Sequence, residues 1–198
     1  MRCPIVQNGS LAGWSIRNGG GGQIVIHPEG AGGSMNSYGH FGRTTIGGGP
    51  SHLIDLGCLV LGRQYEFTAK FKLLDENNNM TAYHCRNDVA WGDPQLCPLL
   101  SITMVDSSGN PTSPQNLANI DPSTIFADNF NNYKAIFTVD TAMASANEAR
   151  IMIKGVRPGV ATLLDDIEIN LYEPPQYDCN ALIPSGDFEV SCNYLISR

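Results

Sequence analysis

Residues 49–73 read GPSHLIDLGCLVLGRQYEFTAKFKL and contain three successive signals. A Gly-Pro turn opens the stretch, and a short apolar run ends at Leu61-Gly62. From Tyr65 to Leu73, apolar and polar residues then alternate without interruption. Alternation with a period of two is typical of a β-strand that buries one face and leaves the other free. We therefore expect a half-buried strand here, with a polar face that is free to contact a ligand.

Short strand candidates separated by turns continue through the rest of the chain. The 198 residues include 21 glycines and 12 prolines, and no long helical period is present. A series of short strands with turns of this kind is typical of a sandwich or a jelly roll. We therefore predict an all-β fold, a jelly-roll β-sandwich of two antiparallel sheets. The further strand candidates are residues 23–27, 99–105, 133–139, 149–154 and 161–171.

The charge and hydropathy of the chain argue against two classes of partner. A net charge of −7 does not suit nucleic acid or an anionic membrane surface, because both attract a basic protein. No apolar run approaches the roughly 18 residues that span a bilayer, so membrane insertion is not expected. The first residues show no signal peptide, so we expect a mature product or an excised piece of a longer chain.

The six cysteines indicate disulfides rather than a metal site. None forms a Cys-x-x-Cys pair, and an even number in an acidic, β-rich chain suits an oxidising, extracellular or cell-wall location. We expect a Cys85–Cys97 disulfide around the loop that contains Trp91; the alternative is two free buried thiols. Two glycosylation sequons, at Asn8 and Asn79, agree with a secreted glycoprotein. The other four cysteines are Cys3, Cys58, Cys179 and Cys192.

The last residues of the chain differ in character from those before them. Consecutive prolines at Pro174-Pro175 cannot continue a sheet ladder, which indicates a linker. Beyond them, residues 182–189 repeat the polarity pattern of residues 5–12. We therefore divide the chain into a module over residues 1–173 and a segment over residues 174–198 that contains the linker and the first strand of a second module.

The order of these elements resembles that of the jelly-roll carbohydrate-binding modules of families four, nine and twenty-two, which have a galactose-binding-domain-like fold. The family opens with an apolar pair, Asn-Gly and Gly-Trp, and closes with an apolar strand and Asp-Asp-Ile. The resemblance spans roughly residues 4–172 of this chain, and its ordered set of motifs carries it rather than any single one. The matching stretches are Val6–Trp14, Gly32–Met35, Gly42-Arg43, Gly49–Leu73, Phe137–Val139, Ile151–Ile153 and Asp165–Ile167.

The resemblance implies a non-catalytic module that binds a polysaccharide or glycan in a concave groove, within a secreted, multi-module protein. It also implies a structural calcium, held partly by an opening Glu and by the second Asp of the closing pair. Asp166 is present, but Ala12 stands where that Glu would be. Calcium needs about six to eight oxygen ligands, so the expected site rests on Asp166 alone. The aromatic residue that the family presents soon after Gly42-Arg43 is also missing.

Sugar binding needs aromatic faces for the ring and polar groups for the hydroxyls. The free face of the 65–73 strand offers Glu66, Thr68, Lys70 and Lys72, and the same alternation turns Arg150, Met152 and Lys154 outward from residues 149–154. Such a mixture suits a polar or anionic glycan better than plain cellulose; the alternative is an ordinary solvated surface. The candidate exposed aromatics are Tyr38, His40 and Phe41 before Arg43, and Tyr83 and Trp91; Trp91 stands among turn residues, where a large aromatic is less expected unless it packs or binds. The candidate binding residues are Tyr38, His40, Arg43, Glu66, Lys70, Tyr83 and Trp91.

No catalytic motif is apparent in the sequence. Ser51, His52 and Asp55 lie close together but without a Gly-x-Ser-x-Gly elbow. Asp165 and Asp166 are neighbours on one predicted strand and should point to opposite faces, so they cannot act as a glycosidase pair. We therefore expect no enzyme activity. The alternative to glycan binding is a structural or adhesive module that acts through protein–protein assembly with neighbouring modules.

Overall fold

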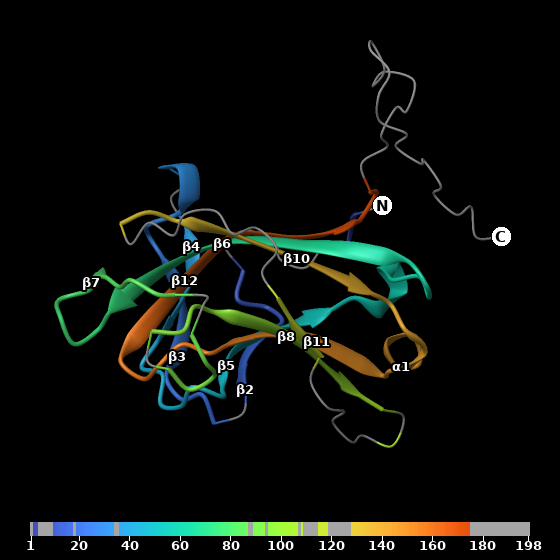
Figure 1. Cartoon of the computed structure of the whole chain (residues 1–198), viewed down its shortest axis with the longest axis horizontal. Helices are drawn as coiled ribbons and strands as arrows, with labels where there is room; N and C mark the ends of the chain where they lie inside the picture. The colour runs from blue at the N-terminus through green and yellow to red at the C-terminus, as the bar shows by residue number, and fades with distance from the viewer. Residues whose placement is uncertain are drawn as a thin grey trace, which may run out of the picture.

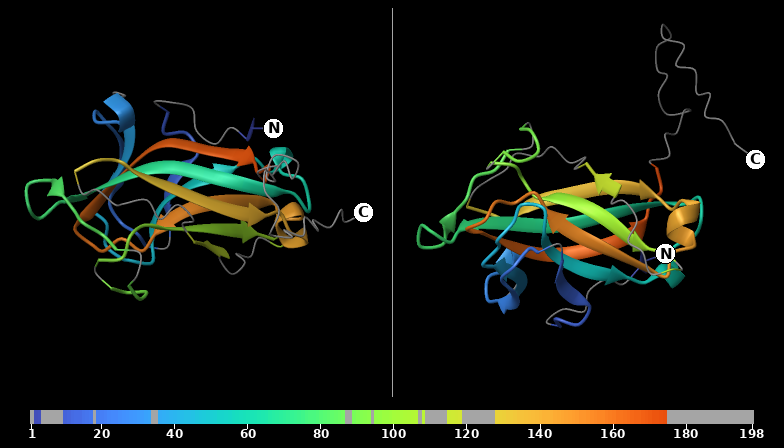
Figure 2. Two further views of the ribbon diagram at one scale, coloured as in Figure 1. Left: turned by 45° about the horizontal axis from the view of Figure 1, so that its top comes forward. Right: turned by 90° about the horizontal axis from the view of Figure 1, so that it is seen from below.

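The computed structural model of the chain contains two antiparallel sheets stacked face to face (Figure 1; Figure 2). Two antiparallel sheets with almost no helix confirm the predicted jelly-roll β-sandwich. Among the described residues, no helix is long and apolar enough to cross a membrane. The structure describes residues 2–3, 10–17, 19–33, 36–86, 89–93, 95–106, 108, 115–118 and 128–174. The predicted start of a second module therefore lies outside the described residues.

The first sheet, called sheet A, has seven strands, in which β10, β6, β12, β4 and β3 follow one another and β1 and β7 pair with β12 and β6. The strands of sheet A are β1 (Arg2–Cys3), β3 (Gln23–His27), β4 (Ser37–Phe41), β6 (Gln64–Asp75), β7 (Thr81–Ala82), β10 (Asn131–Thr138) and β12 (Val160–Leu171).

The second sheet, called sheet B, has five strands in the order β2-β5-β11-β8-β9. Its strands are β2 (Trp14–Arg17), β5 (Gly49–Ile54), β8 (Leu99–Val105), β9 (Gln115–Leu117) and β11 (Glu148–Lys154). Short helical turns occur at η1 (Ala31–Gly33), η2 (Leu56–Cys58) and α1 (Thr141–Ala144).

The core lies between the two sheets, and β6 shows why these residues form it. Its apolar residues from Tyr65 to Leu73 are all at most 5% exposed, whereas the polar residues between them are partly exposed. The predicted alternation is therefore confirmed along the strand. Each fully buried large apolar side chain contributes about 1.5–3 kcal/mol of transfer free energy, so this face of β6 is a major source of stability. Opposite it, Ile151 and Ile153 of β11 belong to the same cluster.

Glycine residues allow two loops to approach each other closely at one end of the sandwich. Gly22 has a φ of 79°, and a Cβ atom there would lie 1.8 Å from the carbonyl oxygen of Phe41. Only glycine fits such a position. The run of glycines from residue 19 therefore brings the β2–β3 turn onto the end of β4, where the carbonyl of Gly21 bonds the Nε2 atom of His40 at 2.8 Å.

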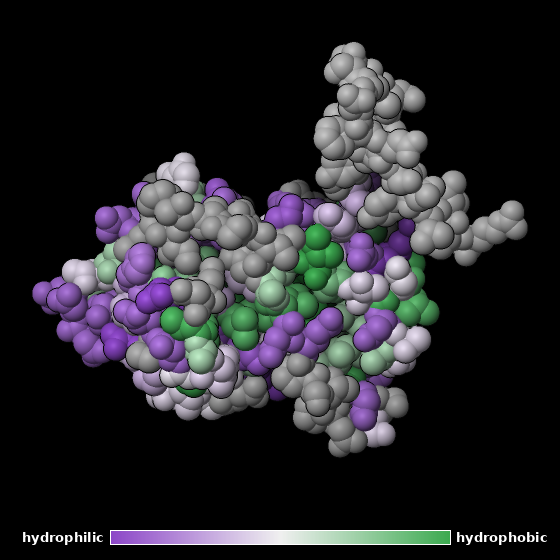
Figure 3. Space-filling model, in the orientation of Figure 1, coloured by the Kyte–Doolittle hydropathy of each residue, from purple (hydrophilic) through white to green (hydrophobic). Residues whose placement is uncertain are grey.

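A disulfide joins Cys85 to Cys97, as predicted, with their Cα atoms 4.8 Å apart. It closes the loop that carries Trp91 before β8 begins. Cys58 is disulfide-bonded as well. The turn of residues 76–80 joins β6 to β7, and Figure 3 shows hydrophilic residues gathered at that end of the molecule.

Candidate functional site

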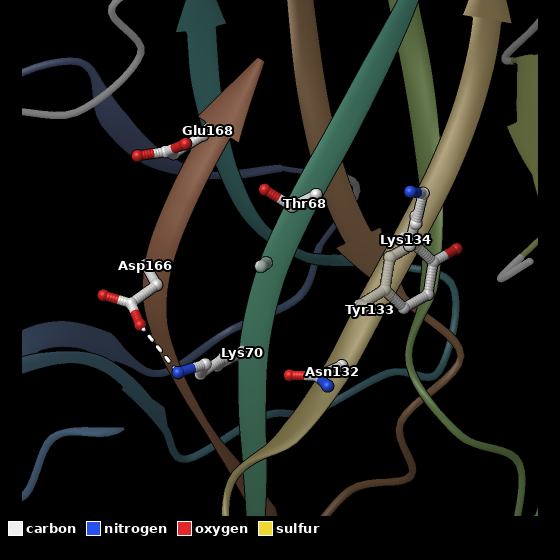
Figure 4. A pocket seen from close by; sticks show the side chains of 8 residues that line it. Thr68, Lys70, Asn132, Tyr133, Lys134, Asp166 and Glu168 are labelled. Carbon is white, nitrogen blue, oxygen red and sulfur yellow. Dashed lines mark ion pairs between the residues drawn. The ribbon is translucent and has the colours of Figure 1, made fainter. Parts of the chain in front are cut away.

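Sheet A carries a hollow of about 330 Å³ on its outer face (Figure 4). Three neighbouring strands form it, because β10, β6 and β12 are adjacent in the sheet and their polar residues alternate with buried ones. The side chains of Lys70 and Asp166 point toward each other across the hollow. The residues that line it are Thr68, Ala69, Lys70, Asn132, Tyr133, Lys134, Asp166 and Glu168.

The lysines of this face are each paired with a carboxylate. The ammonium nitrogen of Lys70 lies 3.0 Å from Asp166, and that of Lys134 lies 2.5 Å from Glu66. Just beyond the hollow, Lys72 contacts Glu29 at 2.6 Å. These pairs are partly exposed, so each contributes about 0–1 kcal/mol at most. Their main effect is that sheet A presents balanced charges to a ligand.

The hollow lacks an exposed aromatic face among the residues that are described there. Tyr133 lines it, but this side chain is only 5% exposed. Its hydroxyl donates to the carbonyl of Leu117 at 2.8 Å and accepts from the N–H of Leu100 at 3.3 Å. Burial raises the pKa of Tyr133 to about 12, and the bond with Leu100 opposes this shift. Tyr133 is thus a core residue rather than a stacking platform.

An apolar cluster occupies the far end of the same outer face. Leu74, Ala161 and Leu163 are almost fully buried, and the partly buried Phe41 and Phe130 pack against them. The ring of Phe41 also lies 5.8 Å from that of His27. Phe41 therefore faces outward on sheet A, as predicted for an aromatic candidate, although most of its surface is used in this cluster.

The outer face of sheet B has a different character, because its central row consists mainly of small hydroxyl residues. Ser15, Ser51, Met152 and Ser101 occupy successive strands at one register position. Ser51 and Ser101 are at most 1% exposed, and within the described part of the chain their Oγ atoms have no hydrogen-bond partner. A buried hydroxyl without a partner is costly, so a buried water molecule is expected to bind there.

A charged network lies over this row on sheet B. The Nε atom of Arg150 contacts the carboxylate of Glu148 at 2.6 Å, and its Nη1 atom donates to Ser15 at 3.0 Å. Arg17 reaches the same carboxylate at 3.7 Å and remains half exposed. Two guanidinium groups therefore share one carboxylate, which leaves N–H donors for another acceptor.

The other end of this face carries Trp91 and Lys154. Trp91 is 55% exposed, which makes it the most exposed large aromatic side chain in the described part of the chain. The Nζ atom of Lys154 lies 5.4 Å from the centre of the Trp91 ring, in a cation–π contact. Lys154 itself is only 8% exposed, and burial lowers its pKa.

Tyr38 and His40 lie in the interior, so the prediction that they are exposed is wrong. Tyr38 is 5% exposed and stacks near Trp14, and His40 is 1% exposed. Residues of β4 alternate, so Tyr38 and His40 point inward whereas Phe41 points outward. Burial lowers the pKa of His40 to about 4; the bond to the Gly21 carbonyl opposes this effect and the Arg43 charge adds to it.

Arg43 is also interior, with 3% of its surface exposed. Its Nη1 atom donates to the carbonyl of Gly48. Burial lowers the pKa of Arg43 to about 10, and the nearby Glu76 charge opposes this. The guanidinium group therefore holds the β4–β5 loop together and is not available to a surface ligand.

The remaining predicted residues are divided between two faces. Glu66 and Lys70 lie on the outer face of sheet A, whereas Trp91 lies over β11 of sheet B. The expectation of one surface formed by the free sides of residues 65–73 and 149–154 is therefore wrong, because β6 and β11 belong to different sheets. Tyr83 packs under Arg157, whose guanidinium carbon lies 4.8 Å from the ring centre.

The side chains of Asp165 and Asp166 differ from the prediction in their orientation. The register between β6 and β12 shifts between Asp165 and Glu168, and Asp166 has a φ of 48°. This bulge brings Asp166 into the hollow on the same outer side as Asp165, so the prediction of opposite faces is wrong. Their carboxylates are nevertheless engaged separately: Asp165 accepts from the N–H of Ala31 at 2.7 Å, and Asp166 pairs with Lys70.

The donor set around Asp166 does not fit a calcium ion. An ammonium group contacts its carboxylate, and the described residues contain no cluster of three His, Cys, Asp or Glu side chains. The predicted structural calcium stays a prediction without support from these residues.

Sequence reasoning missed Arg17, Ser51 and Ser101 as candidate site residues. The only available signal was the period-two alternation of the short strands that contain them, which turns each of these residues away from the core. That signal indicates exposure but not which strands become neighbours.

No protein-family model matches the chain, and no curated protein matches it in sequence. Solved structures do match in fold. The CBM22-1 xylan-binding domain of Paenibacillus barcinonensis Xyn10C aligns with a TM-score of 0.54 and 16% identity, over 88% of this chain and 95% of that domain. The CBM22-2 xylan-binding domain of the same protein aligns with a TM-score of 0.55 and 12% identity, over 87% and 99%.

A third match is the C-terminal family 22 carbohydrate-binding module of Clostridium thermocellum Xyn10B, with a TM-score of 0.51 and 13% identity, over 83% of this chain and 89% of that module. At these identities the likeness concerns the fold. The chain therefore has the jelly-roll fold of the family 22 carbohydrate-binding modules, which confirms the predicted resemblance at that level.

Proposed function

We propose that this chain is a non-catalytic module that binds a polysaccharide or glycan on the outer face of sheet B. The observation that carries the proposal is the position of Trp91, which is exposed at one end of this face, on the side of sheet B to which Arg17 and Arg150 also point. An aromatic face next to hydrogen-bond donors and acceptors is the combination that sugar recognition requires.

The outer face of sheet A supports such binding less well. Its lysines are paired with carboxylates, and Tyr133 directs its hydroxyl into the core. A ligand there would have to break ion pairs before it gained contacts. Xylan is the first ligand to test, since the structures with the same fold are described as xylan-binding domains.

The test is isothermal titration calorimetry of the wild-type chain and its variants with xylan and a panel of neutral polysaccharides. We expect Trp91→Ala to weaken binding about 2–10-fold, which corresponds to about 0.5–1.5 kcal/mol for an aromatic contact. Leu61→Ala is the matched control, because Leu61 is also 55% exposed but lies in the loop before β6. Lys70→Ala tests sheet A. Absence of binding to every polysaccharide, or an equal loss in all three variants, would sink the proposal.

A second candidate function is protein–protein assembly in an extracellular, multi-module chain. The observation that favours it is the adjacent pair Val60 and Leu61, which are 49% and 55% exposed at one end of the sandwich. A disulfide-bonded module in an oxidising compartment would suit either function. Light scattering distinguishes them: self-association that a Val60→Ser/Leu61→Ser variant abolishes, together with no glycan binding, supports assembly.

A further inference from the structure

We infer that the outer face of sheet B selects glycans that carry anionic groups, namely uronate carboxylates or sulfate esters. This inference rests on the proposed function and adds the chemical class of the ligand. The charges on the two outer faces, the burial of Lys154 and the contact of two arginines with Glu148 support it.

The strands of sheet B turn three cations and one carboxylate outward. Arg150 and Lys154 share the outward side of β11 with Glu148, and Arg17 points the same way from β2. The whole chain, in contrast, has a net charge of −7. A locally positive surface on an acidic protein attracts anionic ligands.

The environment of Lys154 is the strongest single support for an anionic ligand. It is 8% exposed, and no carboxylate pairs with it among the residues that the structure describes. Within that part of the chain, its ammonium group contacts the ring of Trp91. Burial of a cation without a counter-charge is unfavourable, which agrees with the lowered pKa of Lys154. An anionic substituent placed beside Trp91 would supply the missing counter-charge.

Arg17 and Arg150 extend this site along the sheet. Both contact the carboxylate of Glu148, at 3.7 and 2.6 Å, so one negative charge faces two guanidinium groups. Arg150 lies four residues from Lys154 on the same strand, which corresponds to about 13 Å. An oligosaccharide on Trp91 could therefore place one anionic group at Lys154 and another at the arginines.

The hollow on sheet A shows the contrast within the same molecule. Its Lys70 and Lys134 have their own carboxylates, Asp166 and Glu66. An anion there would compete with an existing partner, whereas at Lys154 it would not. The two faces therefore differ in the charge that they leave uncompensated, and this makes Lys70 a matched control for Lys154.

The experiment compares binding of four polymers by calorimetry at low and high salt. Polygalacturonate and glucuronoxylan carry uronates, κ-carrageenan carries sulfate esters, and linear unsubstituted xylan is neutral. We expect at least one anionic polymer to bind about tenfold more tightly than neutral xylan at low salt, and this preference to shrink at high salt because exposed charges are screened. Whether the uronate or the sulfate polymers show the preference identifies the anionic group.

The variants assign the preference to residues. Lys154→Met, which keeps the length of the side chain, should reduce it to within about twofold while neutral xylan still binds; Lys154→Arg should restore it, and Lys70→Met should leave it unchanged. Thermal melts establish that each variant folds. Equal, salt-independent binding of neutral and anionic polymers that still depends on Trp91 would overturn this inference and leave the proposed function standing. An anionic preference lost in Lys70→Met would overturn it as well, and no binding to any polymer would refute both.

Discussion

The carboxylate of Asp165 accepts a hydrogen bond from the backbone N–H of Ala31 at 2.7 Å, across a sequence separation of 134 residues. Its other oxygen accepts from the N–H of Asp166 at 2.9 Å. Asp165 is 6% exposed, so both bonds are shielded from water. Together with the Lys72–Glu29 pair, this contact fixes the η1 turn to the middle strand of sheet A.

Asp165→Asn should lower the free energy of unfolding by about 1–3 kcal/mol. The amide keeps one acceptor oxygen, so one of the two backbone N–H groups would face an NH₂ group and lose its partner. Urea denaturation measures the change. Glu29→Gln serves as the control in the same turn, where loss of a partly exposed ion pair should cost at most about 1 kcal/mol. Equal effects of the two substitutions would contradict this account.

The stability of the fold should fall between about pH 6.5 and pH 4 because of His40. Burial lowers the pKa of His40 from 6.5 to about 4 in the folded chain. Over that interval the unfolded chain takes up a proton and the folded chain does not, so acid favours unfolding; below about pH 4 both states are protonated and the effect ends. The total loss is roughly 3 kcal/mol.

Carboxylates also titrate in this range, so the informative quantity is the difference between wild type and His40→Gln. We expect the variant to be less stable at neutral pH but to lose less stability on acidification, as measured by urea denaturation at several pH values. Parallel pH profiles for the two proteins would argue against a buried, neutral His40.

Removal of the Cys85–Cys97 disulfide by the double substitution Cys85→Ala/Cys97→Ala should cost about 3 kcal/mol, because the unfolded chain regains the freedom of a closed loop. Since Trp91 lies in that loop, glycan binding should weaken as it does in Trp91→Ala. Denaturation and calorimetry together test this. If the double variant retained full glycan affinity, the disulfide would not position Trp91.

Tyr133→Phe should destabilise the chain by about 1–3 kcal/mol without affecting glycan binding. The hydroxyl bridges Leu100 of β8 and Leu117 of β9, and both backbone groups would lose a partner in the core. Hydrogen exchange should show reduced protection at Leu100. The partly exposed Tyr172 offers a control, for which Tyr172→Phe should change stability by no more than about 0.5 kcal/mol. Unchanged stability in Tyr133→Phe would refute the anchoring role.

Local sequence patterns predicted where the strands lie in the chain better than which strands are neighbours in a sheet. The period-two alternation of β6 is a property of consecutive residues, so Tyr65 and Phe67 could be placed in the core from the sequence. Cys85 and Cys97 could be paired because they bracket a short loop. The choice of sheet for β6 and β11 depends on contacts between distant strands, which no local pattern encodes. For that reason Lys70 and Lys154 were expected on one surface and lie on two.

The candidate site illustrates the same limit. Trp91 was predicted because a large aromatic residue among turn residues is unusual. Its relation to Lys154 depends on the β8–β11 pairing and could not be read from the sequence. His40 shows the opposite error, since its polar side chain suggested exposure although the alternation of β4 turns it inward.

The bulge in β12 has a consequence for how this segment can change in length. Asp165 and Glu168 are three residues apart, yet both face outward, because the register shifts between them. Deletion of Asp166 or Ile167 would leave Asp165 and Glu168 two residues apart, so strict alternation would keep Glu168 outward and the fully buried Ile169 in the core. A single deletion elsewhere in β12, with the bulge retained, would instead exchange the two sides of the strand beyond it. The bulge is therefore where β12 is expected to tolerate the loss of one residue, whereas the parity of its length is constrained on either side.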